Sequence, residues 1–200
     1  MKRLVFWFDV VSPYAWLAFE QLPRTLEGIS HSVEYRPLLL GAVLQHWGQK
    51  GPAEISAKRD WAYREVRWLA HRQGVPLQLP LRHPFRSLEL QRLLVAAGAS
   101  RRNVELVLRH VWIGGADALD AGRVDELRNA LAPQRDPDSD EVKAELRALT
   151  GEAIQHGVFG VPSIECDGRV FWGLDALPML RAAIDGDPWF EHEWERPAGA

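Results

Sequence analysis

A serine and a proline stand where an apolar strand gives way to a helix, in the stretch FDVVSPYAWL at residues 8–17. Serine is a favoured N-terminal cap of helices, and Pro13 suits a first helical turn, where a missing N–H costs nothing. The N-terminus of a helix also carries unpaired N–H groups and the positive end of the helix dipole, which favour an anion. Two roles are therefore open to Ser12: an ordinary helix cap, or a donor to a bound anion.

A second proline, Pro162, directly precedes a predicted β-hairpin. A proline at such a turn is a candidate for a cis peptide bond, and we predict one between Val161 and Pro162. This geometry would expose the backbone N–H and C=O of Val161 to a peptide-like ligand, in the manner of a short added strand. The alternative is that Val161 only packs in the core.

The chain has one cysteine, Cys166, which excludes an internal disulfide and a Cys-x-x-Cys redox pair. It lies in an apolar, strand-like run, where we expect a buried and unreactive thiol. The seven histidines are scattered, and no two of them have the i, i+4 spacing of a zinc site on a helix. We therefore predict no bound metal.

The composition is that of an ordinary globular protein: 200 residues, 46% of them hydrophobic, with a formal net charge of −3. This charge gives no general attraction to nucleic acid or to an anionic membrane. The apolar run at the N-terminus is too short for a signal peptide, and no run is long enough to span a membrane. We expect a cytoplasmic protein whose partner is a small molecule, with no nucleic acid and no membrane involved.

The elements that would position Ser12 form a β-α-β unit. A strand at 3–10, a helix that ends at Gly28 and a strand at 32–40 predict two parallel strands, the first buried on both faces. Pro23 inside the helix predicts a kink or an early end. Strand signals then disappear for more than a hundred residues, and apolar periodicity predicts helices at 54–73, 86–97, 102–113, 123–131 and 139–156. Asp138, with Glu141 three residues later, suggests a capping box for the last of these.

Strand chemistry returns at residues 163–173, where Asp167-Gly168 fits the type I′ turn of a hairpin. A final helix at 175–185 and a tail on the surface complete a β-β-α unit. The whole order predicts an α/β protein with a thioredoxin-like fold interrupted by an all-helical insertion. We assign residues 1–40 and 157–200 to the thioredoxin-like domain and 41–156 to the insertion domain.

Several motifs, taken together and in this order, resemble a known family. They are Phe8-Asp9 with Ser12-Pro13-Tyr14, Gly48-Gln49-Lys50-Gly51-Pro52, Gly157-Val158-Phe159-Gly160-Val161-Pro162 and Phe171-Trp172-Gly173-Leu174-Asp175. The set is similar to that of the 2-hydroxychromene-2-carboxylate isomerases and kappa-class glutathione transferases, in the thioredoxin-like superfamily of disulfide oxidoreductase A. The resemblance implies glutathione as cofactor, a homodimer, and Ser12 as the residue that stabilises the glutathione thiolate.

The resemblance also implies a set of residues that bind glutathione. They are Ser12, Pro13, Tyr14, Gln49, Lys58, Val161, Pro162, Leu174 and Asp175. Asp175 corresponds to the position that binds the glutamyl amine, Lys58 resembles a lysine near the tripeptide, and Gln49 stands where relatives carry asparagine. Each has a simpler alternative: Asp175 as a residue of a helix start, Tyr14 as a core aromatic, and Lys58 as part of a solvated face with Arg59, Arg64 and Arg67.

The reaction implied is the glutathione-dependent cis–trans isomerisation of 2-hydroxychromene-2-carboxylate-type compounds to trans-o-hydroxybenzylidenepyruvate-type products. The partner would thus be a small aromatic carboxylate. Nine tryptophans suit an aromatic-lined pocket, although they suit core packing equally well. Two alternatives stay open: a kappa-like glutathione transferase or peroxidase, which would consume glutathione, and a redox-silent binding protein without turnover.

Overall fold

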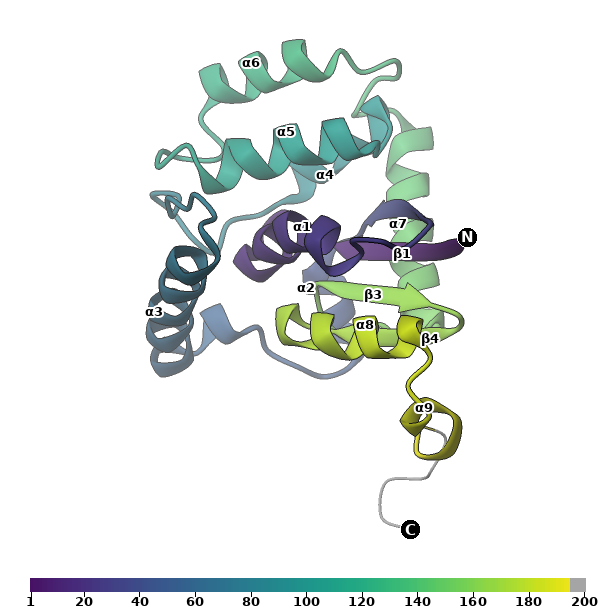
Figure 1. The fold of residues 1–200 in the computed structure, drawn as a ribbon. Coiled ribbons are helices and arrows are strands. Elements are labelled where there is room, and N and C mark those ends of the chain that lie inside the picture. The colour runs from purple at the N-terminus through teal and green to yellow at the C-terminus, as the bar shows by residue number, and fades with distance from the viewer. Residues whose placement is uncertain (195–200) are drawn as a thin grey trace.

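The computed structural model describes residues 1–194, and their strands form a four-stranded sheet in the order β2-β1-β3-β4 (Figure 1). β1 (Lys2–Phe8) is parallel to β2 (His31–Pro37) and antiparallel to β3 (Ser163–Cys166), which is antiparallel to β4 (Arg169–Trp172). Strands from the two ends of the chain therefore lie side by side, as the predicted β-α-β and β-β-α units require.

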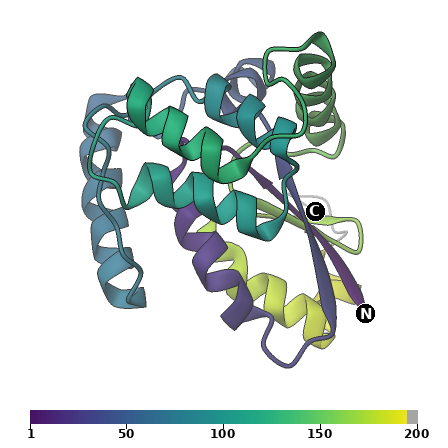
Figure 2. The same cartoon turned by 90° about the horizontal axis from the view of Figure 1, so that it is seen from above.

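Helices cover both faces of the sheet. Figure 2 shows α1 (Pro13–Thr25) and α8 (Leu177–Asp185) on one side of the strands and α7 (Asp140–Gln155) on the other. The short helix η2 (Leu174–Ala176) precedes α8, and α9 (Trp189–His192) follows it. Besides α7, the connection between β2 and β3 contains α2 (Leu40–His46), η1 (Pro52–Glu54), α3 (Ser56–Gln73), α4 (Leu88–Ala97), α5 (Arg101–Trp112) and α6 (Ala121–Leu131).

Side chains of β1 alternate between two cores. Phe6 and Phe8 belong to the larger core with α1, whereas Trp7 points to a smaller core with Val158 and Val161. Phe6 is aligned with Tyr35 of β2, and the two rings are in edge contact with centroids 5.8 Å apart. Burial on both faces explains why this strand reads as a nearly continuous apolar run. Each such large side chain contributes about 1.5–3 kcal/mol when it leaves water.

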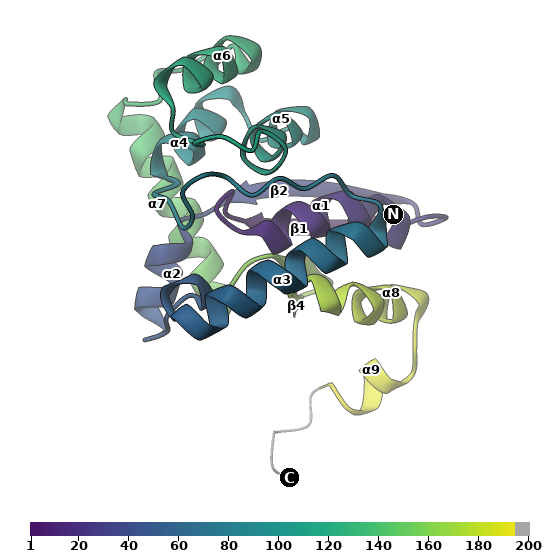
Figure 3. The same ribbon diagram turned by 90° about the vertical axis from the view of Figure 1, so that its left-hand side faces the viewer.

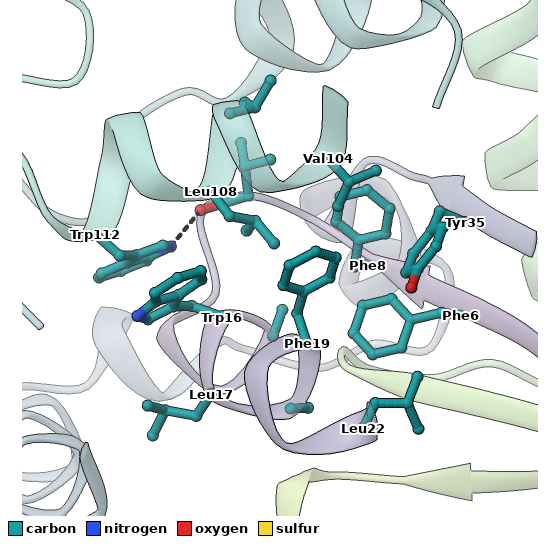
Figure 4. Close-up of a cluster of buried hydrophobic side chains, with 14 of the residues drawn as sticks. Phe6, Phe8, Trp16, Leu17, Phe19, Leu22, Tyr35, Val104, Leu108 and Trp112 are labelled. Carbon is teal, nitrogen blue, oxygen red and sulfur yellow. Dashed lines mark hydrogen bonds between the residues drawn. The ribbon is translucent and has the colours of Figure 1, made fainter. Parts of the chain in front are cut away.

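The larger core continues from α1 into the helical insertion. Trp16 and Phe19 of α1 share it with Val104, Leu108 and Trp112 of α5, and all five are fully buried (Figure 4). α3 packs across α1 from another side (Figure 3). The fold prediction is thus confirmed, whereas the assignment of two domains with borders at 40/41 and 156/157 stays a prediction.

Most predicted element boundaries agree with the structure to within two residues. The hairpin is confirmed, with φ of 51° at Asp167 and 76° at Gly168, as a type I′ turn needs. The first helix ends at Thr25 rather than Gly28, which confirms the early end expected from Pro23. Among the described helices, none is long and apolar enough to cross a membrane.

Three predictions of local structure were wrong. The second strand ends at Pro37 and not at residue 40, because Leu40 begins α2 and its N–H binds the Asp9 carboxylate at 2.9 Å. α7 is capped by Ser139 and not by Asp138, since the Ser139 Oγ accepts the N–H of the third helical residue. The tail is not wholly on the surface, because Phe190 is buried in the larger core. Its residues 195–200 lie outside the described part.

Candidate active site

Ser12 is the N-terminal cap of α1, lies in the turn that follows β1 and is almost fully buried. Its Oγ accepts a hydrogen bond from the Ala15 N–H at 3.3 Å and donates to the Val161 carbonyl at 3.5 Å. The second of these bonds is at the outer limit of hydrogen-bond length, so the hydroxyl proton is weakly held there. Pro13 occupies the first turn of the helix. The same hydroxyl is therefore a helix cap and a donor at the positive end of a helix.

The peptide bond between Val161 and Pro162 is cis, as predicted. The loop before it is held against β4 by aromatic packing: the rings of Phe159 and Trp172 have centroids 4.9 Å apart. Trp172 also covers Gly160 so closely that a β-carbon at this position would collide with the indole. The aromatic side chains of Phe159 and Trp172 thus hold the loop that brings the Val161 backbone beside Ser12.

All nine residues predicted to bind glutathione line one cavity, with a volume of about 1370 Å³. They are Ser12, Pro13, Tyr14, Gln49, Lys58, Val161, Pro162, Leu174 and Asp175. Single-ligand pockets usually have volumes of about 300–1,000 Å³, so this cavity has room for two small molecules. The structure therefore brings the nine predicted residues together around one cavity.

Tyr14 lines the cavity and also packs on the larger core, so it is a core aromatic at the cavity wall, and its binding of glutathione stays a prediction. Its hydroxyl donates to the Glu65 carboxylate of α3 at 2.6 Å. Burial raises the pKa of Tyr14, and the hydrogen bond to Glu65 and the negative charges of Glu65 and Asp175 raise it further. Glu65 was not predicted, because a charged residue on an amphipathic helix carries no local signal of a site.

Asp175 lies in η2, between β4 and α8. Its carboxylate folds back over Gly173, where a β-carbon would collide with Oδ1. Gly173 also has φ of 98°, a conformation that glycine adopts without strain. The buried Leu174 lies between them and lines the cavity. This local geometry holds the carboxylate of Asp175 at the cavity wall.

The helical insertion adds Lys58, in the first turn of α3, and Gln49, in the loop after α2. Among the basic residues of α3, Lys58 and Arg72 line the cavity. Arg64 and Arg67 are exposed and do not line it, as expected of a solvated face. The insertion therefore brings at least one cation to the predicted site.

Asp9 is fully buried, and its carboxylate ties together three segments that meet at the site. It accepts hydrogen bonds from the Val11 N–H at 3.0 Å, the Leu40 N–H at 2.9 Å and the Ser87 hydroxyl at 3.0 Å. Burial raises the pKa of Asp9, while the three hydrogen bonds act in the opposite direction. The sequence motif includes this residue, but its partners could not be read from the motif.

Side chains of the insertion bind the carbonyl groups of the turn that carries Ser12. The carbonyls of Phe8, Val10 and Val11 are bound by Gln91 at 3.3 Å, Trp112 at 3.0 Å and His83 at 2.7 Å, respectively. Figure 4 shows the Trp112 bond beside the core aromatics. The turn is thus held by residues 70 or more positions away in the sequence.

His83 also contacts Tyr63 of α3, and both line the cavity. Because a carbonyl only accepts hydrogen bonds, the Val11 contact assigns the ring proton of His83 to Nε2. The Nδ1 atom therefore accepts from the Tyr63 hydroxyl, at 2.7 Å. Burial lowers the pKa of His83, although the hydrogen bond to Val11 opposes it, and burial raises the pKa of Tyr63. This pair was not predicted, since its members meet only through the loop after α3.

Comparison with known proteins agrees with this arrangement. The DSBA-like thioredoxin domain matches residues 3–185 of the chain. Glutathione S-transferase kappa 2 of Caenorhabditis elegans is 31% identical over 203 residues, which cover 90% of each protein. A 2-hydroxychromene-2-carboxylate isomerase of Sphingobium xenophagum is 26% identical over 192 residues, covering 92% of this chain and 98% of that protein.

A solved structure of 2-hydroxychromene-2-carboxylate isomerase has the same fold, with a TM-score of 0.78 at 23% identity, and covers 97% of this chain and 100% of that one. These matches span the strands at both ends of the chain and the helices between them. The chain therefore belongs to the DSBA-like thioredoxin family, among relatives named kappa-class glutathione S-transferase and 2-hydroxychromene-2-carboxylate isomerase.

Proposed function

We propose that the chain is a glutathione-dependent isomerase that converts 2-hydroxychromene-2-carboxylate-type compounds to trans-o-hydroxybenzylidenepyruvate-type products. The observation that carries the proposal is the place of Ser12, whose hydroxyl lies at the N-terminus of α1, beside the Val161 backbone and inside the cavity. The names of the relatives support glutathione as the thiol. The buried Cys166 of β3 has no second cysteine with which to act.

Glutathione is an extended tripeptide with an ammonium, two carboxylates and a thiol, and residues of the cavity would bind its ammonium, one carboxylate and its cysteinyl backbone. The backbone of Val161 would pair with the cysteinyl residue, Asp175 would bind the ammonium, and Lys58 would bind a carboxylate. Tyr14, Gln49, Pro162 and Leu174 would complete the walls. Bound glutathione would supply a thiolate that adds to a conjugated carbon of the substrate and leaves after rotation about the resulting single bond.

The task of Ser12 is to keep that sulfur ionised. A free thiol has a pKa of about 8.5, so lowering it by about two units requires about 2.7 kcal/mol of differential stabilisation. A hydrogen bond to a charged group is worth about 1.5–3 kcal/mol, and the end of a helix up to ~2 kcal/mol. The hydroxyl and the helix together are therefore sufficient. A hydroxyl also cannot form a mixed disulfide with the bound thiol.

Incubation with 2-hydroxychromene-2-carboxylate, with and without glutathione, tests the proposal. We expect turnover only with glutathione, and a loss on the order of 10–100-fold in Ser12→Ala, which lacks the hydrogen bond to the charged sulfur. The matched control is Ser139→Ala, which removes the cap of α7 and does not touch the cavity. Turnover that is independent of glutathione, or unaffected by Ser12→Ala, would contradict the mechanism.

A kappa-like transferase or peroxidase is the second candidate function, favoured by the 31% identity to a kappa-class transferase. It uses the same thiolate but consumes glutathione, so a balance of glutathione before and after turnover separates the two. A redox-silent binding protein would show neither turnover nor, by calorimetry, glutathione binding. The homodimer and the cytoplasmic location stay predictions.

A further inference from the structure

We propose that Tyr63 is a catalytic acid–base residue for the aromatic substrate and that, with His83, it moves the proton that opens the substrate's ring. The inference rests on the proposed function for the class of substrate. It does not depend on glutathione, because ring opening and thiolate addition are separate steps. It assigns a task to the part of the cavity that the glutathione residues leave free.

The hydrogen bonds fix the direction in which a proton can move. The Tyr63 hydroxyl lies 2.7 Å from His83 Nδ1 and 2.9 Å from the His83 carbonyl oxygen, and both of these atoms are acceptors. His83 Nε2 is occupied by its bond to the Val11 carbonyl at 2.7 Å. A proton that leaves Tyr63 therefore has Nδ1 as its base. The phenol oxygen, in turn, keeps lone pairs that accept a proton from a bound molecule.

The surroundings of the pair suit an aromatic ligand. The His83 ring is in edge contact with Trp112, at a centroid distance of 5.4 Å, and with Phe85, at 6.2 Å. Phe85 and Arg86 line the cavity together with Tyr63 and His83. Phe85 offers an aromatic wall, Arg86 a cation for a carboxylate, and Tyr63 with His83 a proton relay. The proposed substrate carries an aromatic ring, a carboxylate and a hydroxyl.

A 2-hydroxychromene is a cyclic hemiketal, so its ring opens by loss of the hydroxyl proton. In the proposed step the hemiketal proton passes to the Tyr63 oxygen, while the Tyr63 proton passes to His83 Nδ1. The bond from the hemiketal carbon to the ring oxygen breaks, its electron pair stays on that oxygen, and the carbonyl forms. The imidazolium then returns its proton through Tyr63 to the phenolate, so atoms and charge balance without a further reactant.

The experiment follows the exchange between the ring-closed and ring-open forms of 2-hydroxychromene-2-carboxylate by NMR saturation transfer, with the full chain and without glutathione. We expect the wild-type protein to accelerate this exchange. Tyr63→Phe should lower the acceleration on the order of 10²-fold, the usual contribution of a positioned acid or base. His83→Gln should lower it as well, because the amide keeps a donor for Val11 but is not a base.

Two matched variants serve as controls. Tyr35→Phe removes a hydroxyl from the core, away from the cavity, and should leave the exchange unchanged. Ser139→Ala, which removes the cap of α7 and lies outside the cavity, should leave it unchanged as well. The exchange assay contains no glutathione, whereas the turnover assay requires it. Failure of the proposed function would therefore appear in the turnover assay and not in this one.

A second substrate distinguishes a catalytic role of Tyr63 from a purely structural one. Cis-benzylidenepyruvate, which lacks the ring hydroxyl, cannot form the hemiketal and needs no ring opening. With glutathione present, Tyr63→Phe should isomerise it at the wild-type rate. Equal losses on both substrates, or no acceleration of ring exchange by the wild-type protein, would overturn the proposal.

Discussion

The strand-bearing ends of the chain and the helical insertion contribute different things to the same cavity. The ends supply Ser12, Val161 and Asp175, each beside a helix start or a turn. The insertion supplies Trp112 and His83, which bind the carbonyl groups of the turn before Ser12. The groups proposed to act on glutathione thus come mainly from the thioredoxin-like part, and their placement depends on residues outside it.

This difference shows what an insertion adds to a thioredoxin-like fold. A serine needs only a helix terminus to become a donor to an anion. The orientation of that terminus is set by Asp9, whose partners include Ser87 of the insertion. Tyr63 and His83 then provide a second pair of reactive groups on the same scaffold. The insertion therefore supports the start of α1 and, in our proposal, also supplies residues that take part in the reaction.

The largest effect is expected for Trp112→Ala, which tests whether the insertion holds the turn before Ser12. It removes a fully buried indole and its hydrogen bond to Val10, so we expect the free energy of unfolding to fall by about 3–5 kcal/mol. Trp61→Ala on α3 is the matched control, because this side chain is 63% exposed and should cost less than ~0.5 kcal/mol. Urea titration of both variants gives the comparison. Equal effects would mean that the insertion does not hold the turn.

Asp175→Asn tests the contribution of the strand-bearing ends of the chain to glutathione binding. The proposed ion pair with the glutamyl ammonium predicts that glutathione binds about 10–150-fold more weakly, corresponding to about 1.5–3 kcal/mol. Calorimetric titration measures this, and Asp125→Asn on α6 is a control outside the cavity. An analogue without the amine, glutaryl-cysteinyl-glycine, should bind the wild-type protein and Asp175→Asn with equal affinity. A loss of equal size for the analogue would refute the assigned contact.

The smallest expected effect is a pH dependence confined to the insertion. Burial lowers the pKa of His110, while its hydrogen bond to the Ala118 carbonyl opposes the shift. Below the unfolded pKa of about 6.5 the unfolded chain binds more protons, so stability falls as the pH drops through the folded pKa. The slope from one such group is at most about 1.4 kcal/mol per pH unit.

Unfolding measured between pH 5 and 8 should therefore show a shallower loss of stability in His110→Gln than in the wild type. His110 does not line the cavity, so glutathione binding should not change. His83 has the same direction of shift, and it leaves a residual slope in the variant. An unchanged slope would mean that His110 is as easily protonated in the folded chain as in the unfolded one.

Local chemistry explains why much of the fold could be predicted from the sequence. Asp167-Gly168 encodes its turn in two residues, and β1 is recognised by its buried, continuous apolar run. α2 was missed because Leu38, Leu39 and Leu40 prolong the apolar pattern of β2. What ends that strand is a contact between Leu40 and Asp9, 31 positions away, which no local pattern contains.

The candidate site divides in the same way. Ser12 and the Val161-Pro162 pair were found because each sits at a junction of elements with a recognisable residue type. Tyr63 and His83 were missed, because 20 residues separate them and no spacing rule links a helix residue to a loop residue. Sequence patterns thus locate residues that shape the backbone, whereas residues that meet through tertiary contacts require the structure.

The central claim is that Ser12 and the start of α1 keep a bound thiol ionised near neutral pH. Ultraviolet titration of the thiolate band in the glutathione complex tests it most directly. Burial raises the pKa of the Cys166 thiol, so this residue does not add to the signal near neutrality. We predict a pKa about two units below the free value of about 8.5, and a return toward that value in Ser12→Ala. A bound thiol that titrates near 8.5 in the wild-type protein would contradict the account.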